Sequence, residues 1–267
     1  MYRMLAVDLD DTLLQDDNTI NQAVCQGIKS LDGNVEVVIS TGRMFSSAVQ
    51  YARELDLTGP VISYNGAMVR SAGDGQILEE HTLQPDLARE IMDFGRAKDI
   101  YTNIYIDDQL YYLGGREIAD YYAGLSRVKA SPLQEGLGDF RKPPTKLLFI
   151  DFSEDIIKEL EDTLQSMYGG EAVITRSKPI FLEVVPPGIS KRTALANLCK
   201  KRGISPSEVV AVGDSPNDKE MLQWAGMGVA MANAYDEIKD IADFITRKDN
   251  NQGGVREVID KFFQRQE

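Results

Sequence analysis

The chain has 267 residues, of which 43% are hydrophobic and 27% charged, a composition typical of a folded protein with one large or two modest domains. Its formal net charge of −13 argues against general affinity for nucleic acid or anionic lipid, because the long-range field repels both. No apolar stretch approaches the roughly 20 residues of a membrane span, and the early acidic residues do not fit a signal peptide, so the cytoplasm is the expected location.

The first part of the chain alternates short apolar strands with amphipathic helices. The predicted elements are strands at residues 4–9, 35–40 and 61–64 and helices around residues 24–31 and 45–55. Strands that are apolar on both faces and alternate with helices are typical of a parallel sheet that is covered on both sides.

The middle of the chain has a different pattern. It contains predicted helices at residues 86–98 and 154–168, a possible short helix, a hairpin at 101–113, and strands at 145–151, 172–177 and 180–185. Hairpins mixed with helices indicate an α+β unit with an antiparallel sheet. Pro85 near one junction, and Pro186, Pro187 and Gly188 near the other, are residues suited to a change of chain direction.

The last part returns to the alternating pattern. It comprises predicted helices at residues 193–202, 219–225, 236–242 and 255–262 and strands at 209–212, 228–231 and 244–246. We therefore predict an α/β fold in which residues 1–81 and 188–267 build one core domain with a parallel sheet, and residues 82–187 form an inserted α+β domain.

Polar residues follow several of the predicted core strands. In a parallel α/β sheet, ligands bind beyond the carboxyl ends of the strands, where Asp8, Asp10 and Asp214 are expected to meet. Clustered carboxylates raise one another's pKa values unless a cation compensates them. Because the candidate ligands are all oxygen atoms, the expected cation is Mg²⁺.

The sequence lacks residues that several classes of catalytic site require. His81 is the only histidine, which argues against Ser-His-Asp triads and HExxH zinc sites, and no GxxxxGK[ST] loop occurs. Cys25 and Cys199 lie far apart and are expected to be reduced residues of helices. Carboxylates and a lysine are left to carry the chemistry.

Four motifs occur in an order that resembles the haloacid dehalogenase superfamily of phosphohydrolases. They are "DLDDT" (residues 8–12), "ISTGR" with Thr41, "GISKRTAL" with Lys191, and "GDSPND" (residues 213–218). The insert between the second and third motifs resembles the large cap of the Cof-type sugar-phosphate phosphatase branch. "YNGA" and "MANA" (residues 64–67 and 231–234) resemble signatures of the same branch.

The resemblance implies a role for each motif residue. Asp8 would be the nucleophile that forms an aspartyl-phosphate, and Asp10 would protonate the leaving oxygen and then activate water. Mg²⁺ would be held by the side chains of Asp8 and Asp214 and the main-chain carbonyl of Asp10. The expected phosphate ligands are the amides of Leu9 and Gly42, the hydroxyl of Thr41, Lys191 and Asn217. Asp218 would orient these groups without binding the metal directly. Ser190 is expected to cap the helix that begins at Lys191. The alternative for Lys191 is that it is a solvated surface lysine.

Two positions depart from the family pattern. Asp11 and Arg192 stand where glycine is usual. Asp11 adds charge beside the site and can alter the geometry of the loop, but activity is expected to survive. Arg192 either adds phosphate affinity or faces solvent.

The resemblance also implies that the cap closes over the site and reads the substrate beyond its phosphate. The basic residues of the insert are candidates for holding an anion, or are solvated: Arg141, Lys142, Lys146, Arg176 and Lys178.

The sequence therefore predicts a Mg²⁺-dependent phosphatase of small phosphorylated metabolites such as sugar phosphates. The expected partner is a small phosphate ester, without nucleic acid or membrane, and the chain is expected to be a monomer or weak homo-oligomer. A phosphomutase with the same aspartyl-phosphate chemistry, a phospho-acceptor module and a catalytically silent binding protein remain as alternatives.

Overall fold

The computed structural model describes residues 1–31, 33, 35–126, 128–133 and 142–263. The chain divides into two compact units. The core unit comprises Met1–Gly42, Ala48–Leu78 and Ser190–Glu267, and the insert unit comprises Arg43–Ser47 and Glu79–Ile189. Among the described residues, no helix combines the length and the apolar composition that a membrane span requires.

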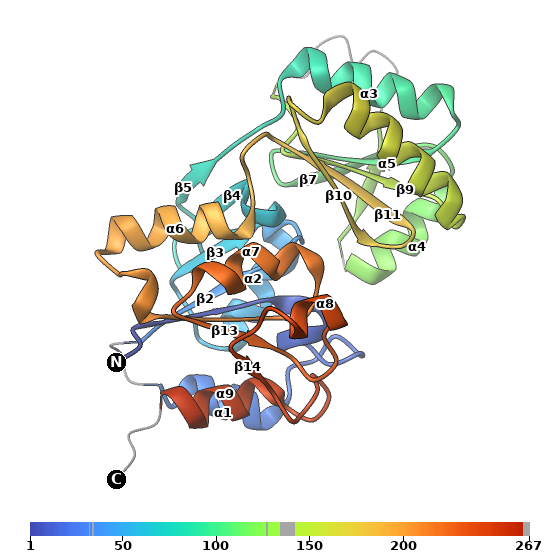
Figure 1. Cartoon of the computed structure of the whole chain (residues 1–267). Coiled ribbons are helices and arrows are strands. Elements are labelled where there is room, and N and C mark those ends of the chain that lie inside the picture. The colour runs from blue at the N-terminus through green and yellow to red at the C-terminus, as the bar shows by residue number, and fades with distance from the viewer. Residues whose placement is uncertain (32, 34, 127, 134–141, 264–267) are drawn as a thin grey trace. The chain divides into compact units, whose positions relative to one another are not determined.

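One sheet, of eight strands within the described residues, organises the core unit (Figure 1). Its strands in spatial order are β14 (Phe244–Ile245), β13 (Met227–Ala230), β12 (Val209–Gly213), β1 (Met4–Val7), β2 (Glu36–Ser40), β3 (Pro60–Ser63), β4 (Met68–Ser71) and β5 (Ile77–Glu80). The strands from β14 to β3 pair in parallel, and β4 pairs with β3 in the antiparallel sense. All four residues of β1 are fully buried, as expected for a strand covered on both faces.

Helices and short turns connect these strands. They are α1 (Gln22–Lys29), α2 (Phe45–Glu54), α6 (Lys191–Arg202), α7 (Lys219–Trp224), α8 (Asp236–Lys239) and α9 (Gly254–Phe262), with a π-helical turn η1 (Leu9–Leu13) and 3₁₀ turns η2 (Tyr64–Gly66), η3 (Pro206–Glu208) and η4 (Pro216–Asp218). Figure 1 shows α1 and α9 side by side on one face of the sheet and α6 and α7 together on the other.

The insert unit contains a second sheet. The strands in spatial order are β10 (Val173–Lys178), β11 (Phe181–Val185), β9 (Lys146–Ile150), β6 (Tyr101–Ile106), β7 (Gln109–Leu113) and β8 (Ala130–Pro132), joined by α3 (Pro85–Ala97), α4 (Arg116–Ser126) and α5 (Glu154–Tyr168). All pairs but β7 with β8 are antiparallel. Buried residues of α3 and α5, among them Ile91 and Leu160, share one core with Ile104 and Phe149 of the sheet. The predicted α/β fold with an α+β insert is confirmed.

Some elements differ from the sequence prediction. The helix expected at residues 236–242 ends at Lys239. The reason lies in Asp243, whose amide donates to the Gly228 carbonyl over 2.8 Å and whose carboxylate accepts from the Gly228 amide over 2.8 Å. These two bonds turn the chain into β14 at the edge of the sheet, where a helix cannot continue. Strands β4, β5 and β8 were not predicted.

Candidate active site

Parallel strand register brings the acidic residues of two motifs to one edge of the core sheet. Val7 at the end of β1 pairs with Val212 of β12 on one side and with Ile39 of β2 on the other. Asp8 and Asp214 follow these paired residues directly or after one glycine, and the Asp8 amide donates to the Val212 carbonyl over 2.9 Å. Two segments that lie about two hundred residues apart thus present carboxylates at the same place.

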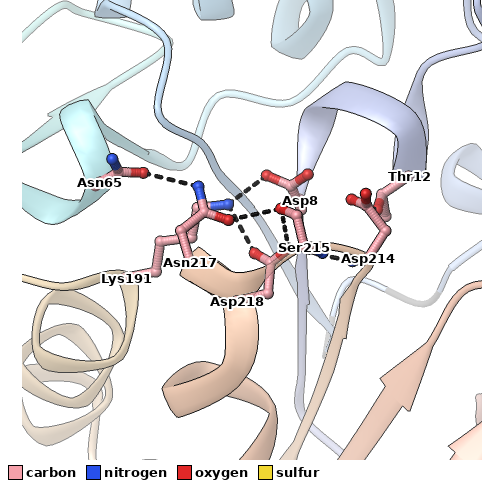
Figure 2. Close-up of polar contacts among 8 residues, drawn as sticks. All are labelled: Asp8, Thr12, Asn65, Lys191, Asp214, Ser215, Asn217 and Asp218. Atoms are coloured by element: carbon pink, nitrogen blue, oxygen red, sulfur yellow. Dashed lines mark hydrogen bonds and ion pairs between the residues drawn. The ribbon is translucent and has the colours of Figure 1, made fainter. Parts of the chain in front are cut away.

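Lys191 lies between the carboxylates of Asp8 and Asp218, the last residue of the fourth motif (Figure 2). Its Nζ is 2.5 Å from Asp8 Oδ1 and 2.7 Å from Asp218 Oδ1, and its side chain is only 1% exposed. The prediction that Ser190 caps the helix is confirmed, because its hydroxyl accepts from the Thr193 amide and the Thr193 hydroxyl accepts from the Ser190 amide. The alternative that Lys191 is a solvated surface lysine is wrong.

Asp218 uses both of its carboxylate oxygens within the protein. Besides the contact of Oδ1 with Lys191, Oδ2 accepts from the amides of Asp214 and Ser215, each over 3.1 Å. A Cβ atom on Gly213 would lie 2.5 Å from the Asp218 side chain, so a glycine is needed for this close approach. The expectation that Asp218 orients its neighbours is consistent with these bonds.

Asp214 has a partner that the sequence did not reveal. Thr12, the last residue of the first motif, donates its hydroxyl to Asp214 Oδ1 over 2.9 Å, and both side chains are buried. The position of Thr12 directly after Asp10 and Asp11 was the available signal, because a threonine beside a cluster of carboxylates is a ready hydroxyl donor. Figure 2 shows the two side chains facing one another.

The electrostatics of the site follow from burial and from like charges. Burial and the carboxylate of Asp218 raise the pKa of Asp8 well above its usual range, although Lys191 opposes the shift. Burial and Asp218 also raise the pKa of Asp214 to about 7. For Lys191, burial favours the neutral form, but the carboxylates of Asp218 and Asp8 outweigh it and raise the pKa above the ordinary value. The three carboxyl groups can carry more negative charge than the single ammonium group of Lys191 compensates.

The donor set fits a hard divalent cation. Carboxylate oxygens of Asp8, Asp214 and Asp218 lie within 4.8 Å of one another, and all three residues are buried. Buried carboxylates with raised pKa values gain the most from a nearby cation, and a site made only of oxygen atoms suits Mg²⁺. Asp10 is not part of this group of carboxylates, and its predicted contribution is its main-chain carbonyl on the adjoining turn η1.

The predicted phosphate ligands follow the ends of β1, β2 and β12 or, for Lys191, begin α6. Asn217 donates to Asn65 Oδ1 over 3.1 Å and accepts from the Ser215 hydroxyl over 2.7 Å (Figure 2). Thr41 and Leu9 are fully buried, and the Thr41 carbonyl accepts from the Asn65 amide. A Cβ atom on Gly42 would lie 3.0 Å from Asn65 Oδ1.

Asn65 is therefore a residue of the site that received no role from the sequence. It links the second and fourth motifs by contacts with Thr41 and Asn217. Tyr64, Asn65 and Gly66 all have positive φ angles, of 53°, 56° and 104°. The Asn-Gly pair after a strand was the signal that could have pointed to this turn.

The two departures from the family pattern lie in different surroundings. Asp11 has φ 56° and ψ 9°, the left-handed conformation that glycine adopts most readily and that aspartate tolerates better than most residues. Arg192 is exposed to solvent.

Basic residues of the insert have acidic partners of their own. Lys146 forms a buried ion pair with Glu183 over 2.7 Å, and Arg176 and Lys142 pair with Glu161 and Asp107. Lys178 is exposed, and Arg141 lies outside the described residues.

Comparisons with known proteins show the family of the chain. The family model for haloacid dehalogenase-like hydrolases matches residues 5–259. The 5-amino-6-(5-phospho-D-ribitylamino)uracil phosphatase YitU of Bacillus subtilis is 29% identical over 268 residues, covering 97% of each chain.

Solved structures show the same relationship. A haloacid dehalogenase-like hydrolase from Bacteroides thetaiotaomicron has a TM-score of 0.90 and 28% identity, covering 98% of this chain and 100% of that one. The protein TM0651 of Thermotoga maritima has a TM-score of 0.86 and 32% identity, covering 99% of each chain. The match extends from the first motif through the fourth, so the resemblance inferred from the motifs is confirmed: the chain belongs to the haloacid dehalogenase-like hydrolase family.

Proposed function

We propose that this hydrolase is a Mg²⁺-dependent phosphatase of small phosphorylated metabolites that works through an aspartyl-phosphate on Asp8. The observation that carries the proposal is the buried arrangement of Lys191 between Asp8 and Asp218, beside the carboxylate of Asp214. A cationic lysine at this place can stabilise the negative charge of a phosphoryl group, which is the main requirement of phosphoryl transfer.

The proposed reaction has two displacements. In the first, a carboxylate oxygen of Asp8 attacks phosphorus while Asp10 gives a proton to the leaving ester oxygen. In the second, Asp10 takes a proton from water, the water oxygen attacks phosphorus, and Asp8 and inorganic phosphate are released. The amides of Leu9 and Gly42, the Thr41 hydroxyl, Lys191 and Asn217 are the proposed ligands of the phosphoryl oxygens.

Mg²⁺ is the proposed cofactor because the site offers an excess of buried carboxylate. Asp8, Asp214 and the main-chain carbonyl of Asp10 would hold it, while the bonds of Asp218 to Lys191, Asp214 and Ser215 support an orienting role for that residue. When bound, the ion supplies positive charge that offsets the repulsion between the carboxylates and a phosphate ester.

The proposed substrates are sugar phosphates or similar small phosphomonoesters. The name of the relative YitU describes a substrate with a phosphorylated ribityl group, which belongs to this class. We propose that residues 82–187 act as the cap domain that recognises the part of the substrate beyond the phosphate. The net charge of −13 favours a small ester over nucleic acid or a membrane surface, in a cytoplasmic protein that is a monomer or a weak homo-oligomer.

The test is hydrolysis of p-nitrophenyl phosphate by the wild type and by Asp8→Asn, each with Mg²⁺ and with a chelator, followed by a panel of sugar phosphates. We expect turnover by the wild type with metal alone, and a folded but inactive variant. Near wild-type turnover by Asp8→Asn would show that the nucleophile is another group. Phosphate release without a bisphosphate activator would count against a phosphomutase, and a long-lived phosphoprotein without turnover would favour the phospho-acceptor alternative.

A further inference from the structure

Two asparagines from the C-terminal part of the core unit contact the loop that follows β1. This loop, residues 8–14, carries Asp8, Asp10 and the left-handed residue Asp11. The side-chain amide of Asn233 donates to the Asp11 carbonyl over 2.7 Å. Asn233 belongs to the segment "MANA", to which the proposed chemistry gives no part.

The orientation of the Asn233 amide is determined by a second contact. Its Oδ1 accepts from the main-chain amide of Asn250 over 3.1 Å, which leaves Nδ2 as the atom that faces Asp11. The side chain therefore joins two main-chain groups, one in each segment, and neither end of its amide can be exchanged for the other without losing a hydrogen bond.

Asn250 holds the far end of the same loop. Its Nδ2 donates to the Leu14 carbonyl and to Asp16 Oδ1, each over 3.0 Å, and the residue is buried. The main chain after β1 is thus held at Asp11 by Asn233 and at Leu14 by Asn250. We call these two residues the asparagine clamp.

The clamp acts on the residue whose torsion angles orient Asp10. The Asp11 φ and ψ angles of 56° and 9° relate the peptide that contains the Asp10 carbonyl to the peptide that contains the Asp11 carbonyl. Because the second peptide is held by Asn233, the first has less freedom to rotate. A left-handed aspartate has extended alternatives that cost less, so an external contact is needed to keep it in place.

We propose that Asn233, oriented by Asn250, is a positioning residue that aims the Asp10 carbonyl and carboxyl for metal binding and proton transfer. The inference rests on the proposed function, since it concerns the same site. It predicts that loss of the Asn233 amide weakens Mg²⁺ binding and slows turnover even though the residue is exposed and its two side-chain hydrogen bonds go to the main chain of Asp11 and Asn250.

The test compares Asn233→Ala with Gln15→Ala. Gln15 Nε2 donates to the Asn251 carbonyl over 3.1 Å, so the control removes an exposed amide contact between the same two segments without reaching Asp11. Titration calorimetry of the metal-free proteins measures the Mg²⁺ dissociation constant, and p-nitrophenyl phosphate assays at saturating Mg²⁺ measure kcat and KM.

For Asn233→Ala we expect about a tenfold weaker Mg²⁺ affinity and about a tenfold lower kcat, with the KM for the ester within about twofold of wild type. Gln15→Ala should match the wild type in all three. Wild-type Mg²⁺ affinity in Asn233→Ala, or an equal loss in Gln15→Ala, would overturn the inference. A wild-type protein that binds Mg²⁺ but hydrolyses no ester would overturn the proposed function alone, because the effect of the clamp on the dissociation constant would still be measured.

Discussion

Lys191 and Asp8 form an ion pair of 2.5 Å between side chains that are 1% and 5% exposed, although 183 positions separate them in the chain. The same ammonium group contacts Asp218 over 2.7 Å. Charges buried to this extent lose most of their hydration, so their presence depends on mutual compensation. Lys191 is therefore expected to contribute to folding as well as to phosphate binding.

Lys191→Met tests this dual role. Removing one partner of a buried pair is expected to cost about 3–5 kcal/mol at about pH 8, because Asp8 and Asp218 lose their cation. The cost should shrink at about pH 5, because carboxyls without a cation take up protons in the folded state more readily. Urea unfolding of the metal-free proteins measures the loss, and turnover should fall by about a thousandfold or more.

The matched control for this variant is Lys29→Met. Lys29 pairs with Asp56 over 2.6 Å at the surface, where solvent screens the two charges and the pair contributes little to stability. A loss of stability no greater in Lys191→Met than in Lys29→Met would contradict the account.

The raised pKa of Asp214 predicts how the stability of the metal-free protein depends on pH. Its pKa of about 7 in the folded state lies above the ordinary value of 3.8, so between these values the folded protein keeps a proton that the unfolded chain has lost. The contribution of this group to stability is therefore present at low pH and falls as pH rises toward 7, by up to about 4 kcal/mol. Asp214→Asn, which resembles the protonated acid, should be more stable than wild type at about pH 8 in chelator and similar to it at about pH 5. Equal stability of the two proteins at the higher pH would refute the assignment.

Thr12→Val tests the support that Asp214 receives. Valine keeps the shape of threonine but removes the hydroxyl that donates to Asp214 Oδ1 over 2.9 Å. Because this bond favours the ionised carboxylate, its loss should raise the pKa of Asp214 further and weaken Mg²⁺ binding about tenfold at about pH 7. The deficit should narrow at about pH 9, where the carboxyl is ionised in both proteins. A deficit that is the same at both values would point to altered packing instead of the lost hydrogen bond.

Most of the fold was predictable because apolar strands and amphipathic helices carry strong local signals. The predicted strands and helices of the core recur as β1, β2, β3 and β12 with α1, α2 and α6. The exceptions have weak patterns: β5 reads Ile77–Glu80, in which no residue is buried, and β4 follows a turn of three residues with positive φ angles. Their strand character depends on pairing, of β4 with β3 and of β5 with β4, which the sequence of each segment does not reveal.

The candidate site was predictable to the extent that strand ends and motif order determine it. These placed Asp8, Asp214 and Lys191 in one region. The contacts of Thr12 with Asp214, Asn65 with Asn217 and Asn233 with Asp11 join residues between 152 and 222 positions apart. Whether a given hydroxyl or amide reaches a partner at such a separation depends on the packing of the whole core, and no local pattern encodes it.

Gly66→Ala tests the connection between the turn after β3 and the helix that carries Lys191. Gly66 has a φ angle of 104°, and a Cβ atom there would overlap the Ser190 carbonyl at the start of α6. Backbone strain and overlap together are expected to lower the free energy of unfolding by about 2–4 kcal/mol. Because Ser190 caps the helix, its displacement should also move the Lys191 ammonium away from Asp8, so turnover of the folded variant should fall by about tenfold or more.

Gly124→Ala is the control for this change. Gly124 lies within α4 and has open space where a Cβ atom would be, so alanine should stabilise that helix by up to about 1 kcal/mol and leave turnover unchanged. Urea unfolding and p-nitrophenyl phosphate assays of both variants separate the two effects. If Gly66→Ala lost stability but kept wild-type turnover once folded, the cap of α6 would have no part in placing Lys191, and the lysine would be positioned by its carboxylate partners alone.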